Sequence, residues 1–163
     1  MVLAGSAFVA LAAQVRIPLA PIPVTAQDFA VILVGATLGM RRGFLALAAY
    51  LAEGLLGLPV FAGLNAGPAH LFGPTGGYLI AFPLAAGLMG LAADRGWTGK
   101  LVTCLIAVAT ANVLIMALGI AWASVLLGPK AAIATGLLPF AIWNPIKIIS
   151  AVGLLVARGR AAR

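Results

Sequence analysis

The sequence is poor in the residues that carry most protein chemistry. Its 163 residues include three acids, one histidine and one cysteine, and only 8% of them are charged. A soluble domain averages about 25% charged residues, so this composition excludes an ordinary soluble protein. One cysteine excludes a disulfide framework. With so few ligating and nucleophilic side chains, we expect no metal site, no catalytic set and no enzymatic activity.

Several binding signatures are also missing. The sequence contains no GxxxxGK[ST] motif, so it does not hydrolyse ATP through a P-loop, and we expect no cofactor. The net charge is +7, but the charged residues lie between apolar segments. This distribution does not favour nucleic acid as a partner. The alternation of a membrane β-barrel is absent. Residues 1–13 lack the basic region of a cleaved signal peptide.

Apolar residues, by contrast, are abundant: 64% of the chain is hydrophobic, with 20 glycines and 10 prolines. Glycine, proline and charge divide the chain into six apolar segments, at 2–13, 27–38, 44–56, 77–93, 101–127 and 137–157. We therefore predict an all-α integral membrane protein with six transmembrane helices, in which residues 1–163 form a single transmembrane substrate-binding domain. A span needs about 20 residues, so the second and third segments are expected to be tilted, partly re-entrant or shielded by neighbours.

The basic residues predict an orientation. With six spans, seven of them fall on one side of the membrane, and two, Arg16 and Lys130, fall on the other. The seven are Arg41, Arg42, Arg95, Lys100, Arg158, Arg160 and Arg163. The positive-inside rule places this set, and both termini, in the cytoplasm. We expect the protein to reside in the plasma (inner) membrane. The connections at 14–26, 57–76 and 128–136 then lie outside, where we expect them to cap a ligand site.

The last apolar segment holds a polar, irregular spot. Lys147 lies near its middle, where a charged side chain costs roughly 2.5–3.5 kcal/mol on insertion scales. Asn144, three residues earlier, shares its helix face, and Pro145 frees the carbonyl of Ala141. Lys147 either faces a partner or cavity, or extends to the headgroups. Asn112 is the strongly polar residue in the middle of the fifth segment, and either bonds to a neighbouring helix or serves a ligand.

Aromatic and glycine residues next to these polar groups are further candidates. Tyr78 and Trp143 are either interfacial anchors or flank a ring-shaped ligand. The turn at residues 73–77 enters the fourth segment, where amide N–H groups could meet an anion or a carbonyl.

The three acids and the first segment lead to weaker expectations. Asp28 opens the second segment, where the helix dipole favours an acid. Glu53 is either interfacial or site-lining, and Asp94 belongs to a solvated turn beside Arg95. Ser6 and Ala10 form a small-xxx-small pair, which we expect to pack on another helix, within the chain or in a partner.

Five short motifs resemble, in the same order, those of a known family. They are RIPLAPIPVTAQ at 16–27, LGMRRG at 38–43, GLPVFAG at 57–63, GPTGGY at 73–78 and AFP at 81–83. The chain is thereby similar to BioY proteins, the biotin-specific substrate-binding (S) components of energy-coupling factor (ECF) transporters. The resemblance implies six helices around a biotin site capped by outer loops. It also implies partners, namely a transmembrane coupling subunit and ATPase subunits, which supply the energy.

The resemblance also implies roles for residues. The last helix of the family usually carries Asp three residues before Lys, whereas this chain has Asn144 before Lys147. Lys147 would pair with the carboxylate or another acceptor on the ligand, Asn112 and Asn144 would serve the ureido group, and aromatic residues would cover the ring. The predicted substrate-binding residues are Gln27, Thr75, Gly76, Gly77, Tyr78, Asn112, Trp143, Asn144 and Lys147. An S component for another vitamin, or a solo secondary transporter, is the alternative.

Overall fold

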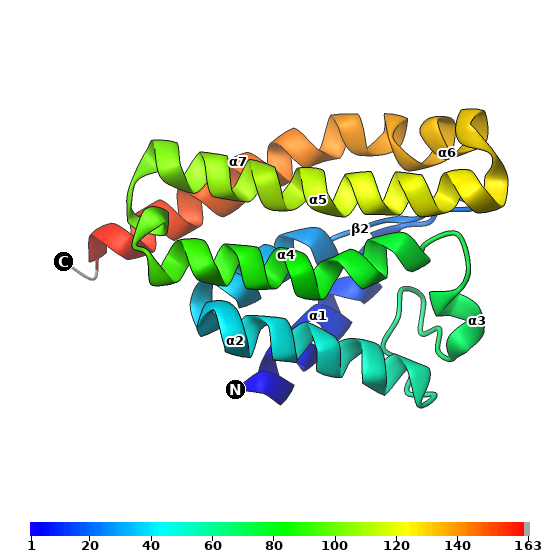
Figure 1. Cartoon of the computed structure of the whole chain (residues 1–163), viewed down its shortest axis with the longest axis horizontal. Helices are drawn as coiled ribbons and strands as arrows, with labels where there is room; N and C mark the ends of the chain where they lie inside the picture. The colour runs from blue at the N-terminus through cyan, green and yellow to red at the C-terminus, as the bar shows by residue number, and fades with distance from the viewer. Residues whose placement is uncertain (162–163) are drawn as a thin grey trace.

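Helices dominate the computed structural model, which describes residues 1–161 (Figure 1). The elements in chain order are α1 (Val2–Gln14), β1 (Arg16–Ile17), β2 (Val24–Thr25), α2 (Gln27–Leu55), α3 (Pro68–Leu71), α4 (Gly76–Asp94), the 3-10 helix η1 (Trp97–Gly99), α5 (Leu101–Leu127), α6 (Pro129–Gly136) and α7 (Leu138–Ala161). The predicted all-α class is confirmed, and the six predicted segments correspond closely to α1, the two halves of α2, α4, α5 and α7.

Four helical stretches within residues 1–161 are long and apolar enough to cross a membrane: Gln27–Leu55, Gly76–Asp94, Leu101–Leu127 and Pro129–Gly159. The helix α1 is apolar but shorter. The chain is therefore a multi-pass membrane protein by length and composition. The count of six spans, with both termini in the cytoplasm, remains a prediction.

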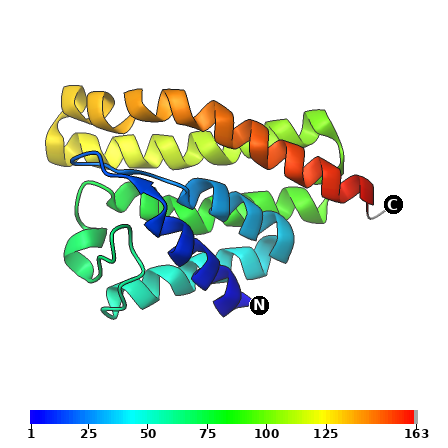
Figure 2. The ribbon, with the colours of Figure 1, turned by 180° about the vertical axis from the view of Figure 1, so that it is seen from behind.

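The second helix folds back on itself at Gly39. A straight helix rises 1.5 Å per residue, so Gln27 and Tyr50 would lie about 35 Å apart along it; instead, Gln27 Nε2 donates a hydrogen bond of 2.7 Å to the Tyr50 hydroxyl. The bend comes from Gly39, whose φ of +79° is a conformation that suits glycine. The break that we predicted between the second and third segments is thus a hairpin of two arms, which Figure 2 shows from behind.

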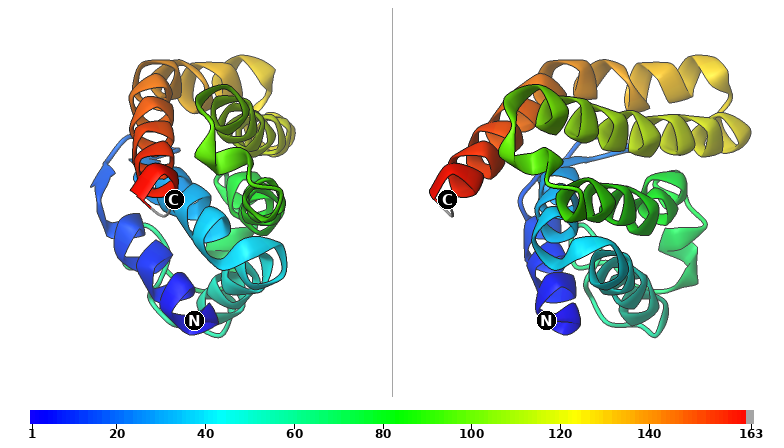
Figure 3. Two further views of the ribbon diagram at one scale, coloured as in Figure 1. Left: turned by 90° about the vertical axis from the view of Figure 1, so that its left-hand side faces the viewer. Right: turned by 60° about the vertical axis from the view of Figure 1, so that its left-hand side comes forward.

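The first arm of α2 runs through the middle of the helix bundle (Figure 3, left). Seven of its residues, among them Gln27, Asp28 and Gly35, are buried. Close packing against α4 depends on small residues, because a Cβ on Gly35 would lie 2.3 Å from the Ala86 carbonyl oxygen. Neighbouring helices therefore shield this short arm, as the sequence suggested, and α2 delivers polar residues into the interior.

The connections fold over one end of the bundle, which we call the loop end. Residues 14–26 form a two-stranded antiparallel hairpin in which Arg16 pairs with Thr25. The connection after α2 carries Phe61, which is fully buried and sits edge-on to Tyr50, with ring centroids 5.5 Å apart. The second connection thus folds back over the bundle. The third connection, at 128–136, contains the helix α6.

The opposite end, the basic end, gathers the turn of the α2 hairpin and the connection from α4 to α5. Met1 lies beside Arg42, with Sδ 3.7 Å from Nη1. Asp94, predicted to lie in a solvated turn, is exposed and also accepts a 3.1 Å hydrogen bond from the Met40 amide, which opens the second arm. Arg163 lies outside the described residues, and Arg160 is described only as α7 backbone.

Candidate functional site

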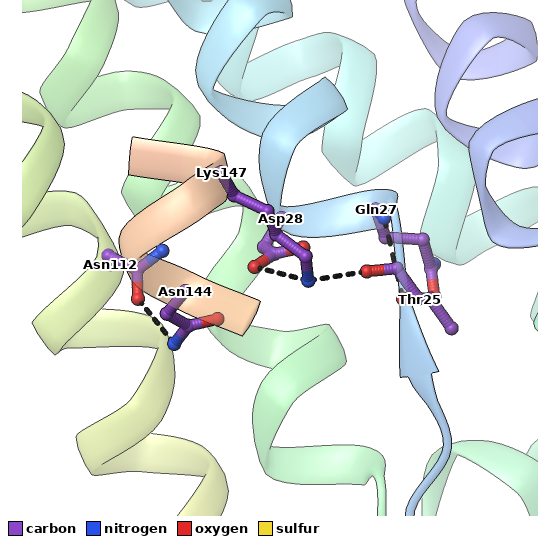
Figure 4. A network of polar contacts seen from close by, with 6 residues as sticks. All are labelled: Thr25, Gln27, Asp28, Asn112, Asn144 and Lys147. Carbon is purple, nitrogen blue, oxygen red and sulfur yellow. Dashed lines mark hydrogen bonds and ion pairs between the residues drawn. The ribbon is translucent and has the colours of Figure 1, made fainter. Parts of the chain in front are cut away.

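An ion pair between α7 and the start of α2 forms the centre of the site (Figure 4). The Lys147 Nζ lies 2.8 and 3.0 Å from the two carboxylate oxygens of Asp28, and it donates a further 2.7 Å bond to the Thr25 carbonyl. The side chains of Lys147 and Asp28 are only 16% and 8% exposed. Side chains on a helix tilt toward its N-terminus, so Lys147 reaches toward the loop end and inward, not to the headgroups.

A second polar pair lies one helical turn from Lys147. Asn144 Nδ2 donates a 2.8 Å hydrogen bond to Asn112 Oδ1, which joins α7 to α5. The other two amide atoms, Asn112 Nδ2 and Asn144 Oδ1, are buried without a partner among the described residues. In the view of Figure 4, both atoms lie on the side of the pair that faces Asp28. A buried donor or acceptor left unpaired costs about 1–3 kcal/mol, so this pair presents one free donor and one free acceptor.

A largely apolar cavity opens at the loop end above these pairs. It encloses about 490 Å³ including space open to solvent. Its lining residues are Ile22, Pro23, Thr25, Gln27, Asp28, Ala62, His70, Thr75, Tyr78, Leu79, Phe82, Ile115, Met116 and Phe140. Asn112 precedes Met116, and Asn144 follows Phe140, by four residues each. Since four residues make one helical turn, the asparagines lie one turn deeper than the lining.

Aromatic rings and hydroxyls form one wall of this cavity. Tyr78 and Phe140 stack with ring centroids 5.8 Å apart, and the Tyr78 hydroxyl donates a 3.0 Å bond to the Gly136 carbonyl. The Lys147 Nζ lies 5.6 Å from the Phe140 ring centroid, within cation–π range. Gln27 is held by its bond to Tyr50. The predicted residues Gln27, Thr75 and Tyr78 therefore all line the cavity.

A second, more open pocket adjoins the first and contains Arg16. It shares Pro23, Ala62, His70 and Thr75 with the first cavity. Arg16 makes no ion pair in the described part of the chain, and its guanidinium lies against Gly63, where a Cβ would come within 2.8 Å of Arg16 Cζ. An exposed cation thus lines the pocket that adjoins the cavity.

His70 lies at the junction of the two pockets. Its ring stacks on Phe61 at 5.2 Å, and burial lowers the pKa of His70 from its ordinary value of 6.5. The ring is consequently uncharged at neutral pH, and Arg16 carries the positive charge of this pocket.

Three predicted site residues lie elsewhere. Trp143 is 41% exposed on the outer surface of α7 and is absent from the cavity lining, so our placement of this ring over a ligand is wrong. Gly76 and Gly77 are buried against neighbouring segments: a Cβ would lie 1.9 Å from the Leu71 oxygen and 2.4 Å from the Leu118 oxygen, respectively. These glycines permit close packing and do not line the cavity.

Glu53 and Ser6 form a separate contact, between the second arm of α2 and α1. The Ser6 hydroxyl donates a short hydrogen bond to a Glu53 carboxylate oxygen, and Ser6 is fully buried. Glu53 therefore does not line the cavity, and its carboxylate bonds to a side chain inside the protein. Ser6 packs within the chain, and Ala10 is partly buried against the core. Of the two alternatives for this pair of small residues, packing inside the chain is the correct one for Ser6.

The pairing of Asp28 with Lys147 is what the sequence analysis missed. We attributed Asp28 to the helix dipole and named no acidic partner for Lys147. One signal was available, because a chain with three acids and one embedded lysine has few ways to neutralise that charge. Asp28 and Lys147 are 119 positions apart in the sequence, so their proximity is not apparent until the first arm of α2 enters the bundle.

Comparison with known proteins identifies the family. The model of the BioY family matches residues 1–163. The chain belongs to the BioY family. The probable biotin transporter BioY of Pyrococcus horikoshii is 40% identical over 146 residues, which cover 90% of this chain and 86% of that protein. The biotin transporter BioY of Thermotoga maritima is 46% identical over 90 residues, covering 55% and 53%.

A solved structure extends this relationship to the fold. The crystal structure of the S-component for biotin from an ECF-type ABC transporter superposes with a TM-score of 0.79 at 27% identity. The match covers 99% of this chain and 88% of that one. The resemblance drawn from five short motifs is thus confirmed over residues 1–163 of this chain.

Proposed function

We propose that this chain binds biotin at high affinity, and takes part in its uptake, as the membrane-embedded S component of an ECF-type transporter in the plasma membrane. Its relatives named as biotin transporters and its structural similarity to the S-component for biotin support this assignment. Among the described residues, the cavity at the loop end has the lining of a ligand site, mostly apolar and aromatic with a few polar groups. We infer that the chain binds its ligand and does not transform it, because its relatives are named as transporters.

The observation that carries the proposal is the free donor and acceptor of the asparagine pair. A ureido group has two N–H donors and one carbonyl acceptor. Asn144 Oδ1 accepts from one N–H, and Asn112 Nδ2 donates to the carbonyl, which pairs both buried atoms. The fused rings and apolar tail occupy the cavity beside Tyr78 and Phe140. Binding therefore gives a hydrogen-bond partner to two buried atoms, each of which costs about 1–3 kcal/mol when it is left unpaired.

The carboxylate of biotin binds toward the second pocket. Lys147 was our first candidate for this group, but Asp28 already neutralises it at 2.8 Å. A ligand carboxylate brought to that pair would meet the negative charge of Asp28. Arg16 has no acidic partner in the described part of the chain and lines the adjoining pocket. We assign the carboxylate to Arg16, so that the ureido end lies deep and the charged end lies outside.

Energy for transport comes from partner subunits. The sequence has no nucleotide-binding motif, and the solved relative belongs to an ABC transporter of the ECF type. A transmembrane coupling subunit and ATPase subunits are the partners that this role requires, with the lipid bilayer around the S component.

Mass spectrometry of small molecules that co-purify with the protein tests the proposal. Wild-type protein extracted in detergent should carry biotin, and an Asn112→Leu variant, which removes the amide at similar volume, should carry far less. Thr110→Leu is a matched control, because Thr110 lies on the exposed face of the same helix and its hydroxyl bonds only to the Ile106 carbonyl. Recovery of a different vitamin from the wild type would refute the assignment to biotin.

A further inference from the structure

We propose that Asp28 is a specificity-determining residue of this cavity: its carboxylate accepts a ring N–H of the ligand and admits only the ureido end to the cavity floor. This inference rests on the proposed function, because it takes biotin as the ligand, and it assigns a ligand-binding role to a residue on α2. Three observations carry it.

The first observation is the position of the carboxylate. Asp28 belongs to the first turn of α2 and lines the cavity, and it is the acidic residue among the described lining residues. Its side chain is 8% exposed. A charge buried this deeply needs bonded partners, and Lys147 supplies them from one side only.

The second observation is the bonding capacity that remains. An ionised carboxylate offers about four lone-pair sites, and Lys147 Nζ contacts each oxygen once, at 2.8 and 3.0 Å. The remaining sites can accept N–H donors. Hydrogen bonds to an ionised acceptor are roughly twice as strong as neutral ones. A ureido group has a second N–H beyond the one assigned to Asn144, and Asp28 is the acceptor for it.

The third observation concerns charge. Lys147 is tied to both Asp28 and the Thr25 carbonyl, so it holds the carboxylate in place and leaves the pair neutral. A neutral head group with N–H donors fits beside this pair. A ligand carboxylate or a bare ring oxygen would place one acceptor against another. Asp28 therefore fixes the direction in which the ligand enters.

The test is a calorimetric titration of the purified full-length protein in detergent with biotin and with biotin methylated at a ureido nitrogen. Asp28→Asn should weaken biotin binding about ten- to a hundredfold, the range of a hydrogen bond to a charged group. The variant should also lose discrimination between biotin and the methylated analogue. A purely structural role for Asp28 would weaken both ligands equally, and that result would overturn the inference.

Two further variants keep the result interpretable. Asn144→Asp combined with Asp28→Asn returns a carboxylate one helical turn from Lys147, on the same face of α7, and should recover much of the affinity. Asp28→Asn with Lys147→Met removes both charges, so it avoids an unpaired lysine and should fold while binding biotin poorly. Asp94→Asn, the same change at an exposed acid of the basic end, is the control and should bind normally.

The failures of the two proposals are distinguishable. Wild-type affinity for biotin in both Asp28→Asn and Asp28→Asn/Lys147→Met would refute the role of Asp28 and leave biotin as the ligand. Absence of biotin binding in the wild type would refute the proposed function, and the role of Asp28 with it.

Discussion

The ion pair between α2 and α7 should contribute strongly to stability, and Lys147→Met tests how much. Removing the ammonium leaves the Asp28 carboxylate buried, with an exposed fraction of only 8%. Breaking a buried pair by deleting one partner typically costs about 3–5 kcal/mol. For a chain of this size, each kcal/mol lowers the melting temperature by about 2–4 °C, so we expect a loss of about 6–20 °C. Asp28→Asn should cost less, because Lys147 keeps the Thr25 carbonyl and the Phe140 ring.

The melting temperatures of Asp28→Asn, Lys147→Met and the Asp28→Asn/Lys147→Met double variant are measured by thermal unfolding in one detergent, at one scan rate and without ligand. Because the double variant leaves no unpaired charge, it should be more stable than the sum of the single losses predicts. The coupling energy should lie at about 1–3 kcal/mol, the upper part of the range seen for residues in contact. Losses that simply add, with no coupling, would show that the two side chains do not interact.

Three further predictions concern other parts of the chain. Arg16→Gln should weaken biotin binding and remove the preference for biotin over its carboxamide, while Lys147→Met keeps that preference; calorimetry with both ligands decides. Ser6→Leu should lower the melting temperature, because Ser6 is fully buried, whereas Ala7→Leu on the exposed face of α1 should not; equal losses would contradict the packing of α1. With native residues replaced singly, Arg42→Cys should be labelled only from the cytoplasm and Lys130→Cys only from outside, and the reverse pattern would refute the six-span topology.

The helices were predictable from the sequence because apolar runs and their interruptions are local features. The fifth segment was placed without error at Leu101–Leu127, between Lys100 and Gly128. The hairpin at Gly39 was predicted only as a gap between two short segments. Its return path depends on a φ of +79° and on the contact with Asp94, and neither is visible in the composition.

The site was predictable in part, for the same reason. Polar residues within apolar segments are recognisable from the sequence alone, so Asn112, Asn144 and Lys147 were identified as candidate site residues. Their partners depend on which helices adjoin, and the sequence does not state that the start of α2 meets the middle of α7. Trp143 was misplaced because its position beside Asn144 in sequence says nothing about its direction on the helix. Consecutive residues project about 100° apart around a helix, and here Trp143 faces outward while Asn144 faces inward.

Calorimetric titration of the purified, ligand-free protein with biotin tests the central claim most directly, in detergent and without nucleotide or partner subunits. We predict saturable binding of one biotin per chain, which is abolished or strongly weakened in Asn112→Leu and is not displaced by an excess of another vitamin. A wild-type protein that is folded, as judged by its cooperative thermal unfolding, and yet binds no biotin would contradict the account.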